Sequence, residues 1–276
     1  VLKENIELYS SSIYTGAVIF FISFSFTTAL FFLNKFKKRN HKYFLSLLLI
    51  TNLVILILSN SRGLIVASLL SVFFILLIIN KSLFIKIIFS VSVVGIISFS
   101  TSPILEDFAS LYYRTDTTHR EIFWDTGIEI IKDHPITGIG PNRFDKYFYN
   151  YAPSYIFSVQ EWKVGKHTPH NFFLYFTAEN GVLGLIVSGS FFILFFYIAI
   201  KTIKYSKKVN SHYFILSVTI TGIGIGLFIR TFIEVTGFLY YGFITTDLPF
   251  WLCFGILVWI YQKLKMSYSN KVVMVP

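Results

Sequence analysis

Residues 180–200 read NGVLGLIVSGSFFILFFYIAI, a stretch that contains no Asp, Glu, Lys or Arg. A helix that crosses the hydrocarbon core of a bilayer needs about 20 predominantly apolar residues. Strands are not indicated, because apolar residues follow one another here instead of alternating with period two. Six more charge-free stretches occur, at residues 8–34, 43–61, 63–80, 87–105, 209–229 and 248–262. The sequence therefore predicts an all-α integral membrane protein with about seven transmembrane helices.

The composition agrees with a membrane location. Of the 276 residues, 54% are hydrophobic and only 14% are charged, whereas a soluble domain is about 45–50% apolar and about 25% charged. These values argue against a disordered chain and against a soluble enzyme. The chain has a single cysteine, Cys253, which excludes a disulfide framework and disfavours a cysteine-ligated metal site.

The net charge of +10 is explained by four short basic segments. Together they hold 14 Lys or Arg and no acidic residue, and they lie at residues 35–42, 81–86, 201–208 and 263–271. If all seven stretches span the bilayer, these segments fall on one side, which the positive-inside rule identifies as cytoplasmic. Membrane topology thus accounts for the charge, and no nucleic-acid partner is expected.

The segment between the fourth and fifth stretches differs in composition, because it is charged and rich in aromatic and turn residues. Helical periodicity runs through residues 120–132 and should end at His134-Pro135. A loop this long is usually functional. We therefore expect four parts: transmembrane helices 1–4 in residues 1–100, one large external loop domain in 101–170, transmembrane helices 5–7 in 171–266, and a cytoplasmic tail in 267–276.

Arg62 is the most unusual charge, since it lies between two apolar stretches. A charged side chain near hydrocarbon is costly, so it normally faces a cavity or a partner. Arg62 could be a connecting arginine that reaches the outer interface. Alternatively, it could be a fixed cation that binds phosphate or carboxylate, a task suited to the planar guanidinium. Arg114 and Arg120 could join it, or could be ordinary loop charges.

Histidines supply candidates for acid–base chemistry. His167 and His170 come directly before an apolar helix start, and imidazole is the usual general base near neutral pH. A capping or buried interface role is equally compatible with the sequence. Metal binding is only weakly indicated by the spacing of three residues.

Two further features have two interpretations each, and Glu179 is notable for its position. Arg230 and Glu234 are four residues apart at the end of the sixth stretch. Residues at this spacing lie on one face of a helix, so the two side chains could form an ion pair or could line a polar cavity. Gly138 and Gly140 could hold phosphate through their backbone N–H groups, or could form an ordinary turn. Glu179 precedes a glycine inside the apolar region that follows His170.

Five short motifs, taken in order, resemble those of the bacterial O-antigen ligase and O-antigen polymerase family. They are Ser61-Arg-Gly63, His119-Arg-Glu-Ile-Phe-Trp124, His134-Pro-Ile-Thr-Gly-Ile-Gly-Pro-Asn-Arg-Phe144, His170-Asn171 and Glu179-Asn-Gly181. The resemblance covers roughly residues 60–234. Known members have more spans, and this chain begins with Val1, so we expect it to be the C-terminal part of a longer protein.

The resemblance implies an inverting, metal-independent glycosyltransferase of surface polysaccharide or lipopolysaccharide biosynthesis that needs no cofactor. Its donor would be a glycan on undecaprenyl diphosphate, used on the periplasmic face of the bacterial inner membrane. The acceptor would be lipid A-core for a ligase, or another repeat unit for a polymerase. The sequence does not separate these two branches.

By motif position, the resemblance implies roles for individual residues. Arg62 and Arg120 would bind the diphosphate with Arg114 as a helper, and His170 would be the general base. Cavity or supporting roles would go to Glu179, Arg230 and Glu234. The alternative is a transporter or flippase for a lipid-linked or anionic solute. Transporters commonly show repeated halves, and no such symmetry is seen in this sequence.

Overall fold

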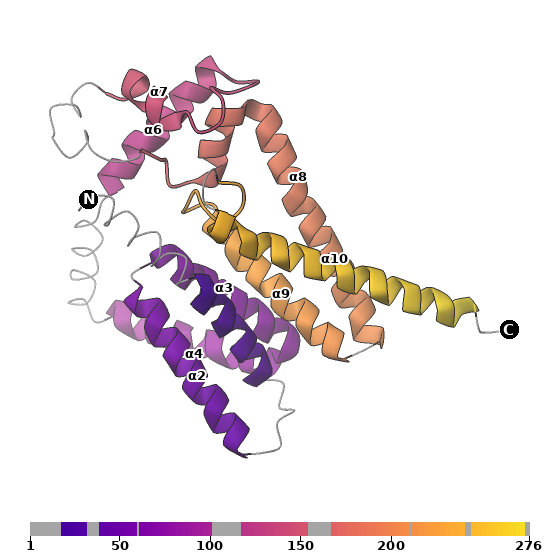
Figure 1. Ribbon diagram of the computed structural model, residues 1–276. Helices are drawn as coiled ribbons and strands as arrows, with labels where there is room; N and C mark the ends of the chain where they lie inside the picture. Colours follow the sequence, from indigo (N-terminus) through magenta and orange to yellow (C-terminus); the bar gives the residue numbers. More distant parts are fainter. Residues whose placement is uncertain are drawn as a thin grey trace, which may run out of the picture. The chain divides into compact units, whose positions relative to one another are not determined.

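The computed structural model of the protein describes residues 18–31, 39–59, 61–100, 117–153, 167–209, 211–240 and 244–273. Over these residues the structure contains helices and no strand, as predicted (Figure 1). The helices are Val18–Phe31, α2 (Arg39–Leu58), α3 (Arg62–Ile79), α4 (Lys81–Ser100), α6 (Thr117–Asp133), α7 (Phe144–Tyr151), α8 (Phe172–Val209), α9 (Ser211–Arg230) and α10 (Ile244–Val273).

Three of these helices have the length and apolar character needed to cross a bilayer. They are Phe172–Val209, His212–Arg230 and Ile244–Met266. Three shorter apolar helices lie at Val18–Phe31, Asn40–Leu56 and Gly63–Ile79. The helices fall on the predicted apolar stretches but extend beyond them. Basic residues that were expected in connecting loops lie inside helices: Lys42 in α2, Lys81 and Lys86 in α4, and residues 201–208 in α8. The number of seven spans stays a prediction.

The chain forms two compact units, which we describe separately. The first contains residues 1–80 and 188–276, and the second contains residues 81–187. In the first unit, α9 packs along α3 (Figure 1). A Cβ added to Gly226 would lie only 2.7 Å from the Ala67 carbonyl oxygen, and one added to Gly222 would lie 2.9 Å from Ile75. Small residues four apart allow such close approach between membrane helices.

These contacts also give the helix directions in the first unit. Gly226 faces Ala67 while Gly222 faces Ile75, so α3 and α9 are antiparallel. The end of α3, which precedes Lys81, therefore lies at the same end of the pair as the start of α9, which follows Lys208.

The other two basic segments reach that same end. In α10, the Lys263 Nζ lies 5.6 Å from the centre of the Tyr213 ring, in the first turn of α9. The helix Val18–Phe31 runs parallel to α3, because a Cβ on Gly226 would touch Phe21 as well as Ala67, and the Ser25 and Ser71 hydroxyls are 3.0 Å apart. In α2, the side-chain N–H of Asn52 donates to the Ser23 hydroxyl at 3.0 Å. Asn52 lies in the second half of α2 and Ser23 in the first half of the helix Val18–Phe31, so these two helices are antiparallel. The start of α2 therefore lies at the same end of the unit as the start of α9. Within the first unit, the helix directions thus gather the described parts of three basic segments, at residues 35–42, 201–208 and 263–271, at one end, which agrees with the topology prediction.

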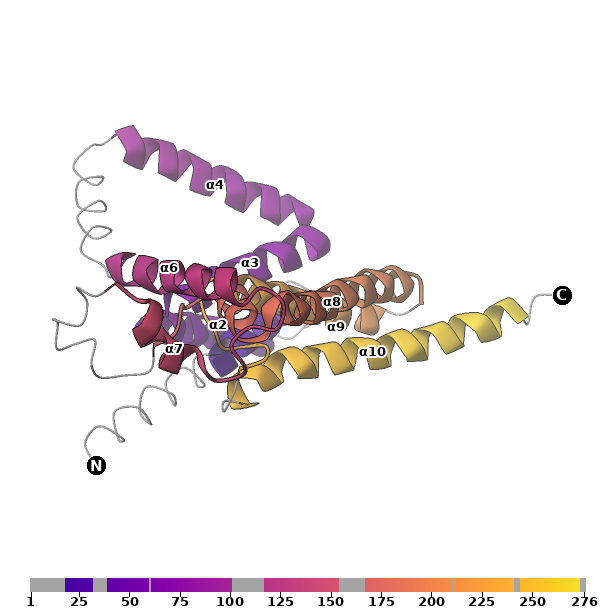
Figure 2. The ribbon, with the colours of Figure 1, turned by 90° about the horizontal axis from the view of Figure 1, so that it is seen from above.

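The second unit contains α4, α6, α7 and the beginning of α8. Helix α6 covers the predicted range 120–132 and ends one residue before His134. Helix α7 packs against it, and Figure 2 shows the two side by side. Residues 101–116 and 154–166 of the expected external domain lie outside the described part of the chain.

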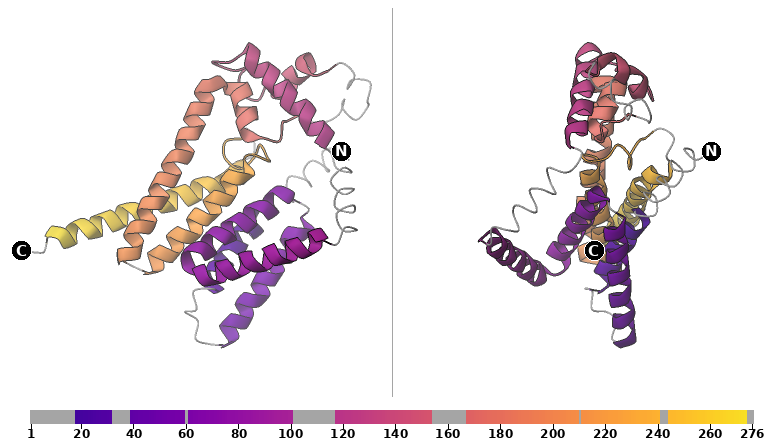
Figure 3. Two further views of the ribbon diagram at one scale, coloured as in Figure 1. Left: turned by 180° about the vertical axis from the view of Figure 1, so that it is seen from behind. Right: turned by 90° about the vertical axis from the view of Figure 1, so that its left-hand side faces the viewer.

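Helix α8 begins earlier than the apolar stretch 180–200 predicts. It starts at Phe172 and contains a kink at Gly181, where φ is 65° and ψ is −168°. The bend between its two parts is visible in Figure 3. The predicted start of the fifth span therefore coincides with a kink inside a longer helix.

Candidate functional site

His170 lies directly before α8, in the second unit. Its side chain is half-buried, and its φ of 46° places the backbone in the left-handed region. For a residue other than glycine this conformation costs on the order of 1–3 kcal/mol, and it persists only where the surroundings enforce it. On one side, Asn171 caps α8, because its Oδ1 accepts the Leu174 N–H at 3.0 Å.

Helix α6 holds the other side of this segment. The indole N–H of Trp124 donates to the Pro169 carbonyl oxygen at 2.8 Å. The Phe123 ring lies edge-on to the His170 ring, with 6.3 Å between centroids. Arg120, which is half-buried, precedes Phe123 and Trp124 by three and four residues and so shares their helix face. The fold therefore turns the Arg120 face of α6 toward the segment that carries His170.

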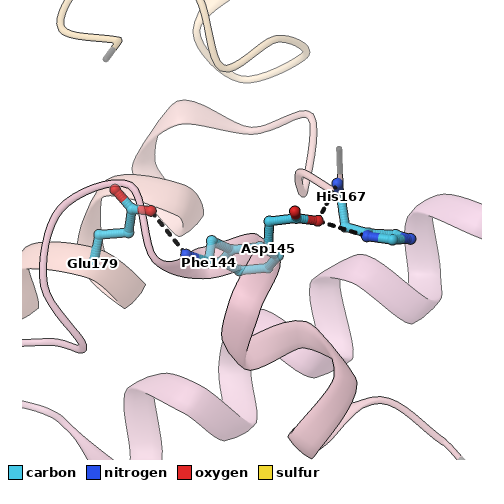
Figure 4. A network of polar contacts seen from close by, with 4 residues as sticks. All are labelled: Phe144, Asp145, His167 and Glu179. Atoms are coloured by element: carbon cyan, nitrogen blue, oxygen red, sulfur yellow. Dashed lines mark hydrogen bonds and ion pairs between the residues drawn. The ribbon is translucent and has the colours of Figure 1, made fainter. Parts of the chain in front are cut away.

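His167 is buried and held by Asp145 (Figure 4). One carboxylate oxygen, Oδ1, accepts the His167 backbone N–H at 2.8 Å and lies 2.6 Å from the ring Nδ1. The imidazole also stacks on Phe148, with 4.3 Å between centroids and 6° between planes. No sequence motif singled out Asp145. The only signal was an acidic residue in the first turn of a short helix.

Glu179 is also buried and supports α7 (Figure 4). Its Oε2 accepts the Asn142 N–H at 2.7 Å, and its Oε1 accepts the Phe144 N–H at 2.9 Å. Both N–H groups are at the start of α7, where a helix has unsatisfied donors and favours negative charge. Glu179 therefore links the first part of α8 to α7. Whether it also borders a cavity stays a prediction.

The glycine-rich turn packs on the kink of α8. The Gly138 N–H donates to the His134 carbonyl, and the Gly140 N–H donates to the Glu179 carbonyl at 2.8 Å. These donors are engaged within the protein, so the turn interpretation is correct and the phosphate cradle is not. A Cβ on Gly181 would lie 2.0 Å from the Ile136 carbonyl oxygen. The His-Pro-to-Phe144 motif and the Glu-Asn-Gly motif thus form one packed structure.

The remaining candidates belong to the first unit. Arg62 begins α3, and its side chain lies outside the described part of the structure. A Cβ on Gly63 would contact Ile233 at 3.5 Å and Glu234 at 3.8 Å. The start of α3 and Glu234 are therefore neighbours, although they are far apart in the sequence.

The prediction that Arg230 and Glu234 share one helix face is wrong. Helix α9 ends at Arg230, whose buried guanidinium donates to the Thr236 carbonyl at 3.0 Å and to its hydroxyl at 2.9 Å. These bonds fold residues 231–236 back over the helix end. Asp247, which the sequence analysis missed, holds the next part of this segment by accepting the Gly237 N–H at 2.8 Å.

Two other predictions concern Arg114 and a metal site. Arg114 lies outside the described residues. Within the described ranges, no group of three His, Cys, Asp or Glu side chains is arranged to hold a metal ion.

Comparison with known families gives one result. A family model described as O-antigen ligase matches residues 44–189, more than half of the chain. The match includes the start of α3, all of α6 and α7, and the first part of α8 with the preceding His170. Among curated proteins, no match to the chain was found.

Proposed function

The chain belongs to the O-antigen ligase family, and on this premise we propose that it is a membrane glycosyltransferase acting on undecaprenyl-diphosphate-linked glycan. Family membership and the apolar helices make it a multi-pass membrane protein of surface polysaccharide biosynthesis with glycan and lipid-linked substrates. We place the reaction on the periplasmic face of the inner membrane. The acceptor is a sugar hydroxyl, on lipid A-core for a ligase or on another repeat unit for a polymerase.

In this proposal the diphosphate is the leaving group and gains negative charge as the glycosidic C–O bond breaks. Guanidinium groups aimed at that charge lower the barrier, because preorganised donors stabilise the transition state more than the ground state. Arg62 and Arg120 carry this role, with Arg114 as a helper. Arg230 and Glu234 have supporting roles in this proposal.

His170 acts as the general base. The acceptor oxygen attacks the anomeric carbon while its proton passes to the imidazole, and the bond to the diphosphate oxygen breaks. A single displacement inverts the anomeric centre. No metal is needed in this scheme, because the arginines supply the positive charge.

One observation carries the proposal. The Trp124 indole bonds the Pro169 carbonyl at 2.8 Å, and the Phe123 ring contacts the His170 ring. Both aromatic residues lie one turn after Arg120 on α6. A cation suited to the leaving group and a base suited to the acceptor are thus supported by one helix in one unit.

The test is reconstitution of the full-length protein in proteoliposomes with an undecaprenyl-diphosphate-linked glycan and two acceptors, lipid A-core and a second lipid-linked glycan. We expect a new glycosidic bond to one of them, and the product identifies the branch. Transfer should survive addition of a chelator. Absence of transfer to both acceptors, or movement of the intact lipid-linked glycan across the bilayer, would favour the transporter alternative.

A further inference from the structure

The contact between Asp145 and His167 fixes two parts of the same residue. The Asp145 Oδ1 atom accepts the backbone N–H of His167 at 2.8 Å and lies 2.6 Å from Nδ1 of its ring. The ring is further confined by stacking on Phe148 and by the edge of Tyr149, whose centroid is 5.1 Å away. Main chain and imidazole of His167 are therefore fixed together, inside a buried aromatic environment.

This fixed point is close to His170 along a stiff connection. Only Thr168 and Pro169 separate the two histidines. The proline ring locks its own φ, and its bulk restricts the residue before it. Pro169 is buried, and its carbonyl accepts the Trp124 N–H. A displacement of His167 would therefore displace His170 by a similar distance.

His170 needs such support because of its backbone. Its φ of 46° is a conformation that the chain leaves readily if released. The Asn171 cap fixes the side toward α8. On the side toward residue 167, the anchors are the Trp124 bond and the two contacts of Asp145.

We infer that Asp145 and His167 are a positioning pair that sets the place of the His170 imidazole. The inference rests on the proposed function, in which His170 is the base. Neither member of the pair touches the reacting atoms in this account. The pair is anchored in turn by Glu179, which accepts the N–H of Phe144, the residue before Asp145 (Figure 4). Glu179 also accepts the N–H of Asn142.

The test compares Asp145→Ala with Asp145→Asn in the full-length protein. The asparagine keeps an acceptor oxygen for His167, whereas the alanine removes it. Asp133→Ala is the matched control, because Asp133 also accepts a side-chain hydrogen bond in this unit, from the Tyr151 hydroxyl at 2.8 Å. Hydrogen exchange of residues 167–171 and the kinetics of glycan transfer are both measured.

We expect Asp145→Ala to speed exchange in residues 167–171 and to lower kcat by roughly 10- to 100-fold, since small misplacements of a catalytic group cost this much. The KM for the lipid-linked donor should stay near that of the wild type. In Asp145→Asn, the exchange rate of residues 167–171 and kcat should both be close to the wild-type values. In Asp133→Ala, neither the exchange rate nor kcat should change.

Three results would overturn the inference. The first is unchanged exchange in Asp145→Ala, and the second is a defect confined to the KM for the donor. The third is a defect in Asp145→Asn as severe as that in Asp145→Ala, because the asparagine keeps the acceptor oxygen for His167. If the wild type transfers no glycan, the proposed function fails, and the exchange measurement alone still decides whether Asp145 holds the segment.

Discussion

At the scale of single residues, the left-handed backbone of His170 stands out. Left-handed backbone in a residue other than glycine is uncommon and often marks a functional site. Here Phe123 contacts the His170 ring itself, and further contacts act on its neighbours through Trp124, Asp145 and Asn171. The protein thus uses several interactions to hold one imidazole in place.

Two substitutions of His170 should separate catalysis from stability. His170→Gly and His170→Val both remove the imidazole, so both should abolish transfer. Glycine adopts the left-handed region freely, whereas a β-branched side chain is strongly disfavoured there. Thermal unfolding in detergent should therefore show His170→Val to be less stable than His170→Gly by about 1–3 kcal/mol. Equal stability of the two variants would mean that the strain is absent.

Sequence patterns indicated some of the structure around the candidate site and missed other parts for physical reasons. Helix α6, which carries Arg120, was predictable because its periodicity is local in sequence, whereas the roles of Arg120 and His170 stay predictions. Asp145 was not predictable, because an acidic residue in a first helical turn is common and its partner is 22 residues away. The end of α9 at Arg230 was also missed, because the turn that follows depends on the contact of that arginine with Thr236.

At the scale of elements, the kink of α8 joins two sequence motifs. Gly181 lies against the Ile136 carbonyl, and the Val182 N–H donates to the Pro135 carbonyl at 2.9 Å. The apolar stretch 180–200 predicted a helix, but its start was placed at the kink, because Glu179 is the last charged residue before it. The helical turns before the kink pack inside the second unit, where Phe172, Tyr175 and Glu179 are buried.

Gly181→Ala should disrupt this joint. The new Cβ would lie 2.0 Å from the Ile136 oxygen, at a φ of 65°, and we expect a loss of at least about 1–3 kcal/mol in unfolding free energy. Gly189→Ala is the matched control in the same helix, since its Cβ would meet nothing within 4 Å. The free energy of unfolding of Gly189→Ala should equal that of the wild type or exceed it by up to about 1 kcal/mol. Equal melting temperatures for the two variants would contradict the described kink.

At the scale of the whole molecule, the charge distribution predicts a topology, and the helix directions within the first unit agree with it. Four basic segments were assigned to one side from the sequence, and the described helices of the first unit place their basic ends together. Which helices touch was not predictable, because the contacts depend on glycines such as Gly222 and Gly226 that lie within uniformly apolar stretches. The apolar stretches determine where the helices form, and these glycines determine which helices pack against each other.

Cysteine labelling tests the sidedness. In a Cys253→Ser background, single cysteines at the exposed positions Lys42 and Lys208 should react from the cytoplasmic side, and one at the exposed Lys146 should react from the periplasmic side. The positive-inside rule gives the first two, and the placement of the external loop gives the third. Reaction of all three positions from the same side would contradict the topology.

The central claim is that Arg120 serves the leaving diphosphate while His170 serves the acceptor, and donor binding measured beside transfer tests it most directly. Both quantities are measured on the reconstituted protein with one undecaprenyl-diphosphate-linked glycan. Arg120→Ala should lose transfer by roughly 100-fold, the effect of removing one transition-state donor, and should also weaken donor binding. His170→Ala should bind the donor like the wild type and transfer little. Normal transfer by either variant, or loss of donor binding in His170→Ala, would contradict the account.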